Sequence, residues 1–307
     1  MKCFLSSFAI IILCCLKAGA TDLDKTITVD GLQRQYLVHL PAGYTNSGKW
    51  PVIFALHGGG GNYKNTVSFY HLNGLADARG YIIVYPNALN KSWSMKGVSS
   101  KVKGNSQDID DVKFISVLMD TLTAGYHADP KRFFCTGISR GGIFSLFLAG
   151  NLSERIRAVA PVCASLPQSV IGQYRFKHPT PVLLINGTRD PLISYTGGKG
   201  KFNTSGGTPE EYDMLPTEDL VRKINELNNC AAKPAMTNLP DNDPHDGCTA
   251  VKYTYSCDAA VLEFIHIENG GHTWPGGSQY LPKIIVGKVC RDFKAEEEIF
   301  SFFETMK

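Results

Sequence analysis

The chain has 307 residues, of which 43% are hydrophobic and 19% are charged, and this is the composition of an ordinary globular protein rather than a disordered one. A chain of this length can bury a full core without relying on disulfides or metals. The formal net charge is only +3 and no long block of like charges occurs, which argues against nucleic acid as a main partner and against a strong electrostatic membrane anchor.

The first twenty residues have the pattern of a secretory signal. Lys2 supplies the positive start, residues 8–16 form the apolar run, and Ala18-Gly19-Ala20 is a small-residue cleavage site. The alternative is a membrane anchor, but the apolar run is too short to span a bilayer. We therefore expect residues 1–20 to be removed near Ala20 and residues 21–307 to be secreted, either outside the cell or into a periplasm.

The rest of the chain alternates short apolar runs with helical stretches. Residues 26–40 surround an Asp30-Gly31 turn and predict a β-hairpin. The further strands expected are 51–56, 81–85, 132–135, 158–162, 181–185 and 261–267. The helices expected are 110–122, 141–149, 218–227 and 295–303. Short apolar strands that alternate with helices predict an α/β fold, with a mostly parallel central sheet and helices on both faces.

Two segments, 197–207 and 231–247, look irregular and carry no predicted conformation. Neither has the composition of a linker between domains, and no internal repeat is present. We therefore expect residues 21–307 to form a single domain with loop insertions.

Cleavage near Ala20 would leave six cysteines in the mature chain. In an oxidising compartment they can form up to three disulfides, with 15 alternative connectivities. Those in the polar, loop-rich region are plausible bridge partners, whereas those in apolar runs could equally be buried thiols. The six are Cys135, Cys163, Cys230, Cys248, Cys257 and Cys290. Their spacing fits no zinc pattern and leaves the pairing open.

Residues 137–142, Gly-Ile-Ser-Arg-Gly-Gly, place a G-x-S-x-G motif between an apolar strand and an apolar helical stretch. This is the context of a nucleophile elbow, in which a sharp, strained turn lifts a serine hydroxyl above the sheet. The alternative is a chance match in a glycine-rich chain, and the flanking strand and helix argue against it. We expect Ser139 to be a nucleophile.

Residues 56–61, Leu-His-Gly-Gly-Gly-Gly, follow the first long core strand. Glycines allow backbone N–H groups to approach a substrate carbonyl, and such a loop forms an oxyanion hole together with the amide after the nucleophile. This nominates the backbone N–H groups of Gly59 and Arg140. A phosphate-binding loop is disfavoured because the lysine and hydroxyl residue of a P-loop are missing. His57 is expected to be structural.

An acid and a base follow the nucleophile in the chain order that this kind of site requires. Asp190 lies just after the strand at 181–185, and His272 lies just after the strand at 261–267. Singly, such residues are usually turn formers or incidental. Three of them, each just past a strand and in the required order, predict a triad in which His272 moves the proton and Asp190 orients its imidazole.

Several motifs occur collinearly between about residues 50 and 280: LHGGGG, WSM followed by DIDDVKFI, GISRGG, APV, NGTRDPLISYTGG and GGHTWPG. Together they resemble the family of polyhydroxybutyrate depolymerases and feruloyl esterases related to carbohydrate esterase family one. The resemblance implies an α/β-hydrolase fold, a catalytic triad of Ser139, Asp190 and His272, and a role for Trp274 in lining the substrate pocket. The chain departs from the family pattern at Asn186, where histidine is more usual, and at Arg140, where a smaller residue is expected.

These residues predict hydrolysis of a carboxylic ester through an acyl-enzyme, with no metal or organic cofactor. Three substrate classes stay open: feruloyl or acetyl esters of plant polysaccharide, hydroxyalkanoate oligomers or polymer, and small acyl esters. Trp93 and Trp274 would suit a flat or aromatic acyl group. A serine peptidase on the same fold is an alternative enzyme, and a non-catalytic binding protein is disfavoured because all three triad candidates are present. The sequence does not indicate an oligomeric state.

Overall fold

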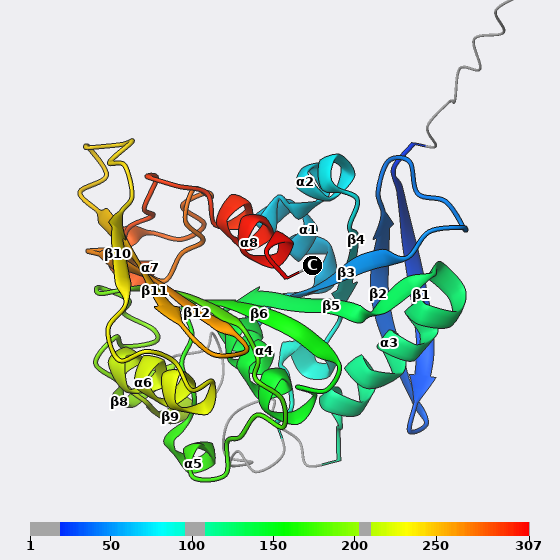
Figure 1. Cartoon of the computed structure of the whole chain (residues 1–307), viewed down its shortest axis with the longest axis horizontal. Helices are drawn as coiled ribbons and strands as arrows, with labels where there is room; N and C mark the ends of the chain where they lie inside the picture. The colour runs from blue at the N-terminus through cyan, green and yellow to red at the C-terminus, as the bar shows by residue number, and fades with distance from the viewer. Residues whose placement is uncertain (1–18, 96–107, 203–209, 307) are drawn as a thin grey trace, which may run out of the picture.

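The computed structural model describes residues 19–95, 108–202 and 210–306 (Figure 1). The secretory signal expected at residues 1–20 therefore lies almost wholly outside the described residues. The centre of the described structure is one twisted, mixed sheet with helices packed on both of its faces. The predicted α/β class is thus confirmed.

Ten strands form the central sheet of the described chain. In spatial order they are β1 (Thr21–Val29), β2 (Leu32–Leu40), β4 (Ile82–Pro86), β3 (Trp50–Leu56), β5 (Ala128–Ile138), β6 (Ile156–Val162), β7 (Val182–Gly187), β12 (Val261–Glu268), β11 (Thr249–Ser256) and β10 (Ala235–Asn238). The inner strands from β4 to β12 run parallel to one another. The pairings at the two edges are antiparallel: β1 with β2 and β2 with β4 at one edge, and β12 with β11 and β11 with β10 at the other. The carboxyl ends of the inner strands consequently meet at one edge of the sheet, where ligands bind in open α/β folds.

The N-terminal hairpin forms as predicted. Val29 of β1 pairs with Leu32 of β2, so the connection has only two residues. Those residues, Asp30 and Gly31, have φ angles of 50° and 78°. A two-residue hairpin turn with positive φ at both positions has the twist that suits antiparallel strands, and an Asp-Gly pair adopts it readily.

The core is divided into two layers by the sheet because successive side chains of a strand point to opposite faces. In β3, Val52, Phe54 and Leu56 join one layer, whereas Ile53 and Ala55 join the other. The first layer is completed by α3 (Asp111–Tyr126), α4 (Arg140–Asn151) and α6 (Thr217–Leu227). The second is completed by α1 (Tyr63–Tyr70), α2 (Leu72–Arg79) and α8 (Ala295–Glu304), which lie on the other side of the sheet in Figure 1.

The predicted helices form within a few residues of their expected bounds. The Asp110 carboxylate accepts a hydrogen bond from the backbone N–H of Lys113 and caps α3, as a residue just before a helix can do. The remaining short elements are η1 (Leu89–Lys91), α5 (Gln168–Ile171), α7 (Lys283–Val286), β8 (Gly198–Phe202) and β9 (Glu210–Met214). Within the described residues, no helix has the length and apolar character needed to cross a bilayer.

The two segments without a predicted conformation contain strands. Residues 198–202 form β8, which pairs with β9 in a separate two-stranded sheet, and residues 235–238 form β10 at the edge of the main sheet. The expectation that 197–207 and 231–247 are irregular is therefore wrong in part. All four residues of β10 are exposed, so this strand lacks the alternation of apolar and polar residues that would reveal it in the sequence.

Of the six cysteines in the mature region, Cys230 and Cys257 form a disulfide. The other four are buried thiols: Cys135, Cys163, Cys248 and Cys290. One of the bridges allowed by the sequence is therefore present. The loop-rich region was the correct place to expect it.

Candidate active site

Ser139 occupies the sharp turn between β5 and α4. Its φ and ψ angles are 57° and −125°, which no L-residue adopts without strain, and strain of this kind concentrates at functional sites. The turn is possible because its neighbours have no side chains: a Cβ on Gly141 would lie 2.0 Å from the carbonyl oxygen of Leu56, and one on Gly137 would lie 2.5 Å from the same atom. The serine is thus held above the sheet edge, at the N-terminus of α4, as the elbow motif predicts.

Tyr70 fastens this elbow to the neighbouring strand. Its hydroxyl accepts a hydrogen bond from the Ile138 N–H at 2.9 Å and donates one to the Leu56 carbonyl at 2.7 Å. Because Tyr70 is fully buried, both bonds are shielded from water. The strained turn before Ser139 is therefore fixed relative to the end of β3.

Asp190 and His272 meet directly, although 81 residues separate them in the chain. The Nδ1 atom of His272 lies 2.7 Å from Oδ2 of Asp190, and both side chains are about 3% exposed. A carboxylate accepts at this position, so in the neutral imidazole Nδ1 carries the proton and Nε2 is the acceptor. The other oxygen, Oδ1 of Asp190, accepts the backbone N–H groups of Leu192 and Ile193, each at 2.8 Å. The carboxylate is consequently held in one orientation against the imidazole.

The loops that carry this pair are joined along their backbones. The N–H of Arg189 donates to the carbonyl of Gly270 at 2.9 Å, and the N–H of Asn269 donates to the Thr188 hydroxyl at 2.9 Å. The approach is so close that a Cβ on Gly187 would lie 2.3 Å from the Gly270 oxygen. The distance between the acid and the base is therefore fixed by backbone contacts and does not depend on the side chains alone.

Ser139 lies one strand away from this pair. Its N–H donates to the Val162 carbonyl at the end of β6, and the thiol of the next residue, Cys163, lies within 4.8 Å of the ligand atoms of Asp190 and His272. Among the described residues, no hydrogen bond joins the Ser139 hydroxyl to the imidazole. Such bonds are often long in structures without substrate and shorten when it binds. The structure thus brings the three predicted residues to one edge of the sheet and joins two of them directly.

Cys163 supports the loop of His272, a role that the sequence did not reveal. Its Sγ donates to the carbonyls of Thr273 at 3.3 Å and Gly271 at 3.6 Å, the two residues that flank the histidine. Burial and the negative charge of Asp190 raise the pKa of the Cys163 thiol. The thiol therefore stays protonated as a donor and is not a competing nucleophile, because only a thiolate reacts.

The glycine loop lies against the elbow. A Cβ on Gly58 would be 3.7 Å from Cβ of Ser139, and one on Gly59 would be 3.7 Å from Cβ of Arg140. The N–H of Gly60, the next residue of this loop, donates to the Lys91 carbonyl at 2.9 Å and holds the loop in place. The two backbone amides nominated for an oxyanion hole therefore belong to neighbouring residues in space, although they are 81 positions apart in the chain.

His57 is structural, as expected. Its Nε2 accepts the N–H of Ala88 at 3.1 Å, so Nδ1 carries the proton and donates to the Gly58 carbonyl at 2.8 Å. Both ring nitrogens hold backbone groups that position the glycine loop. Burial lowers the pKa of His57 from 6.5 to about 4, because the charged form would lose its hydration.

This pKa makes stability depend on pH. The unfolded chain binds a proton at residue 57 below pH 6.5, whereas the folded chain does so only near pH 4. The contribution of neutral His57 is therefore complete above pH 6.5 and is lost as the pH falls toward 4, by up to about 3 kcal/mol. In urea unfolding at pH 7 and pH 4.5, we expect His57→Gln to lose less stability than the wild type, while His178→Gln, an exposed control, follows the wild type. Equal losses in all three proteins would contradict this assignment.

The two tryptophans predicted to line a substrate pocket are both fully buried, contrary to that expectation. Trp274 stacks on Tyr70 with ring centres 4.2 Å apart and donates from Nε1 to Glu296 at 2.9 Å. Trp93 stacks on Phe144 at 4.8 Å and donates to the His57 carbonyl at 2.9 Å. Both rings are part of the core beneath the loops of the candidate site, where they stabilise the conformation of these loops.

Asn186, where histidine is more usual in the resembling family, clamps the end of β7 to the loop after β6. Its side chain accepts the N–H of Ala164 at 3.0 Å and donates to the carbonyl of the same residue at 2.9 Å. A further bond runs to the Thr217 hydroxyl at 3.1 Å. The side-chain hydrogen bonds of this residue therefore give it a structural role.

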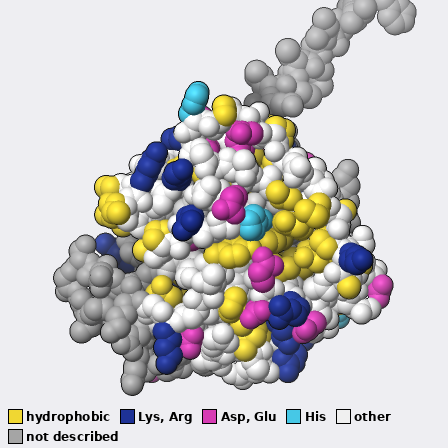
Figure 2. Space-filling view, turned by 90° about the vertical axis from the view of Figure 1, so that its left-hand side faces the viewer, with side chains coloured by type: hydrophobic (Ala, Val, Ile, Leu, Met, Phe, Trp, Pro, Cys, Tyr) yellow, Lys and Arg dark blue, Asp and Glu magenta, His cyan; other side chains and the backbone are white. Residues whose placement is uncertain are grey.

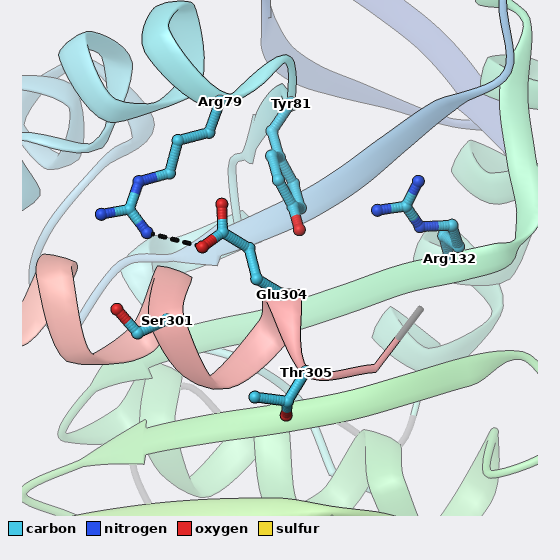
Figure 3. A pocket seen from close by; sticks show the side chains of 6 residues that line it. All are labelled: Arg79, Tyr81, Arg132, Ser301, Glu304 and Thr305. Atoms are coloured by element: carbon cyan, nitrogen blue, oxygen red, sulfur yellow. Dashed lines mark hydrogen bonds and ion pairs between the residues drawn. The ribbon is translucent and has the colours of Figure 1, made fainter.

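A hollow lies away from the candidate site. Figure 3 shows Arg79, Tyr81 and Arg132, together with Ser301, Glu304 and Thr305, around it. Arg79 is paired with Glu304 at 2.9 Å, and the guanidinium of Arg132 lies 5.9 Å from the centre of the Tyr81 ring. Arg79 ends α2, Tyr81 lies just before β4 and Arg132 lies within β5, while the other three residues lie in α8 or directly after it. The hollow therefore shares no residue with the candidate site.

Comparison with known proteins places this site in context. A family model described as "Putative esterase" matches residues 31–192. NocK of Nocardia uniformis subsp. tsuyamanensis, which carries the same description, is 27% identical over 93% of this chain and 83% of its own length. Feruloyl esterase C of Emericella nidulans is 31% identical over 56% of this chain and 60% of its own length. The structure of an acetyl xylan esterase from Aspergillus awamori superposes with a TM-score of 0.57 over 82% of this chain and 94% of that one, at 14% identity, which shows a shared fold.

Proposed function

The chain belongs to the esterase family and is a carboxylic ester hydrolase, and from that premise we propose that it works through an acyl-enzyme formed on Ser139. The observation that carries the proposal is the buried 2.7 Å hydrogen bond between His272 and Asp190. In the neutral imidazole this bond places the proton on Nδ1, so that Nε2 can accept a proton at the sheet edge where the strained serine lies. A base in that state is what removal of a hydroxyl proton requires.

In this mechanism Ser139 Oγ attacks the ester carbonyl while His272 Nε2 takes the hydroxyl proton. Asp190 keeps the other nitrogen protonated and stabilises the imidazolium. The negative oxygen of the tetrahedral intermediate is bound by the backbone N–H groups of Gly59 and Arg140. The imidazolium then gives its proton to the leaving alcohol, and water, activated by the same base, releases the acid from the serine.

For the substrate we propose a feruloyl or acetyl ester of a polysaccharide, and we propose that the protein is exported to reach it. The relative named feruloyl esterase C supports the acyl class. Two features support export: the signal-like pattern of residues 1–20 and the Cys230–Cys257 disulfide, since disulfides persist in oxidising compartments.

A second candidate substrate is a hydroxyalkanoate oligomer, and a specific surface favours it. Tyr280, Leu281, Ile284 and Ile285 are exposed and form an apolar rim along and before α7; Ile284 is 90% exposed. The rim adjoins the candidate base, because the Tyr280 hydroxyl donates to the His272 carbonyl at 3.1 Å. Figure 2 shows the side of the molecule on which α7 and β10 lie, and hydrophobic side chains gather on this face. An apolar polyester chain would bury such a surface.

A substrate panel separates the two candidates. Purified protein is assayed for kcat/KM with methyl ferulate, p-nitrophenyl acetate and a hydroxybutyrate trimer. The leading proposal requires methyl ferulate or the acetyl ester to be the better substrate. A preference for the trimer would replace it with the second candidate, and no hydrolysis of any ester would contradict the proposed chemistry.

The apolar rim gives a sharper test of the second candidate. If the trimer binds there, Ile284→Ser combined with Ile285→Ser raises KM for it about tenfold, which is the effect of losing about 1.4 kcal/mol of apolar contact. Hydrolysis of p-nitrophenyl acetate, which lacks the second and third hydroxybutyrate units, should stay within about twofold. Leu32→Ser, which alters an exposed leucine on the distant hairpin, serves as the matched control. An unchanged KM in the double variant excludes the rim from substrate binding.

A further inference from the structure

Two buried thiols face each other at the edge of the sheet, away from the Cys230–Cys257 bridge. The sulfur atoms of Cys248 and Cys290 and a carboxylate oxygen of Asp246 all lie within 4.8 Å of one another. Both cysteines are almost fully buried. A sulfur–sulfur bond of about 2.05 Å needs only a modest adjustment of two side chains that are already this close.

The backbone around the thiols keeps them together. The carboxylate of Asp246 accepts the N–H of Cys248 through Oδ1 and the N–H of Arg291, the residue after Cys290, through Oδ2, each at 2.6 Å. A second connection joins the same segments, because the N–H of Asn242 donates to Asp292 at 3.0 Å. Both carboxylate oxygens of Asp246 therefore accept backbone N–H groups, and these two bonds hold the segment of Cys248 next to the segment of Cys290.

The segment before Cys290 is hydrogen-bonded to the loop that carries His272. The carbonyl of Val286 accepts the N–H of His272 at 2.6 Å, and the carbonyl of Lys288 accepts the N–H of Gly271 at 2.9 Å. Cys248 lies on the other side, just before β11, which pairs with β12. A bond between the two cysteines would thus attach the support of the His272 loop to the edge of the central sheet.

We propose that Cys248 and Cys290 form a second disulfide when the protein folds in an oxidising compartment. The two thiols lose two protons and two electrons and become one sulfur–sulfur bond, and a small-molecule or protein disulfide takes up the electrons and is reduced to two thiols. The neighbouring Cys248 thiol and burial raise the pKa of Cys290. Because the thiolate is the reactive form, oxidation is slow in the folded protein and occurs during folding.

Peptide mapping tests the bond directly. The full chain is expressed for export, denatured with chelator but without reductant, alkylated, and digested with trypsin and a protease that cuts before Asp. We expect residues 246–252 to be joined to residues 289–291, and the peptides of Cys135 and Cys163 to be alkylated. The Cys230–Cys257 disulfide of the structure serves as the internal control for oxidation.

The proposal is overturned if Cys248 and Cys290 are alkylated while the control linkage is intact. If the control linkage is also open, reduced protein is unfolded and refolded with a mixture of oxidised and reduced glutathione, and the mapping is repeated. If Cys248 and Cys290 are still alkylated after that treatment, the proposed disulfide is also overturned. A disulfide between either of these cysteines and a different cysteine would overturn the proposal as well.

Thermal unfolding gives a second readout. A bridge that closes a loop of this length raises the melting temperature of a chain of this size by roughly 5–10 °C. Without reductant, Cys248→Ser with Cys290→Ser should melt lower than the wild type by that amount, and with reductant the two proteins should melt together. Equal melting temperatures without reductant would count against the bond. Esterase activity is not part of either readout, so failure here leaves the proposed function standing.

Discussion

Replacing Ser139 with alanine lowers kcat/KM for p-nitrophenyl acetate by a factor of about 10⁴ to 10⁶. The variant loses the atom that forms the covalent intermediate, while the oxyanion hole and substrate contacts retain only a small residual rate. Alanine and serine tolerate the strained turn about equally, since both carry a Cβ at a φ of 57°. The fold should therefore survive, which circular dichroism and thermal unfolding will check.

A matched control uses Ser145, a buried serine within α4. Ser145 donates from its hydroxyl to the Gly142 carbonyl at 2.7 Å and has no place in the proposed chemistry. Ser145→Ala should keep activity within about threefold. A fluorophosphonate probe should label the wild type and this control but not the Ser139 variant. Activity in the Ser139 variant above about one hundredth of the wild type, or labelling of it, would assign the nucleophile elsewhere.

Replacing Asp190 with asparagine lowers kcat by about 10⁴ and changes KM little. The side-chain amide donates to Nδ1 of His272 where the carboxylate accepted, so the imidazole proton moves to Nε2 and the base is lost. Because Oδ1 of asparagine still accepts the backbone N–H groups of Leu192 and Ile193, the loop keeps its shape. The measurement is steady-state kinetics at pH 7 together with unfolding in urea.

The chain supplies a matched control in a second aspartate–histidine pair. Nδ1 of His39 lies 2.7 Å from Oδ1 of Asp22, the same separation as in the candidate site, but the pair belongs to the N-terminal hairpin. Asp22→Asn should leave kcat within about twofold. If both aspartate variants lose activity to the same degree, or if neither does, Asp190 has no specific part in the chemistry.

The sequence predicted the inner strands and the long helices because their apolar residues follow the periods of strands and helices. The strands at 51–56 and 181–185, for example, are continuous apolar runs that become the buried β3 and β7. It also predicted which residues follow the carboxyl ends of these strands. The carboxyl ends of parallel strands meet at one edge of the sheet, so the sequence predicts that Asp190 and His272 lie together.

Other features could not be read from the sequence. The edge strand β10 and its neighbour β11 carry few buried residues, so their periodicity is weak. Tryptophan is apolar and also common in binding sites, and residue type alone cannot show that Trp93 and Trp274 pack inward. The pairing of cysteines depends on which loops meet, and the contact between Cys248 and Cys290 follows from the position of Asp246 between their segments.

A crystal structure of the protein inhibited by a fluorophosphonate tests the central claim most directly. We predict a phosphorus–oxygen bond to Ser139, His272 Nε2 within about 3.2 Å of Ser139 Oγ, and the phosphoryl oxygen within about 3.1 Å of the N–H groups of Gly59 and Arg140. A phosphoryl group on any other residue, or an imidazole that no side-chain rotation could bring to the serine, would contradict the proposed relay.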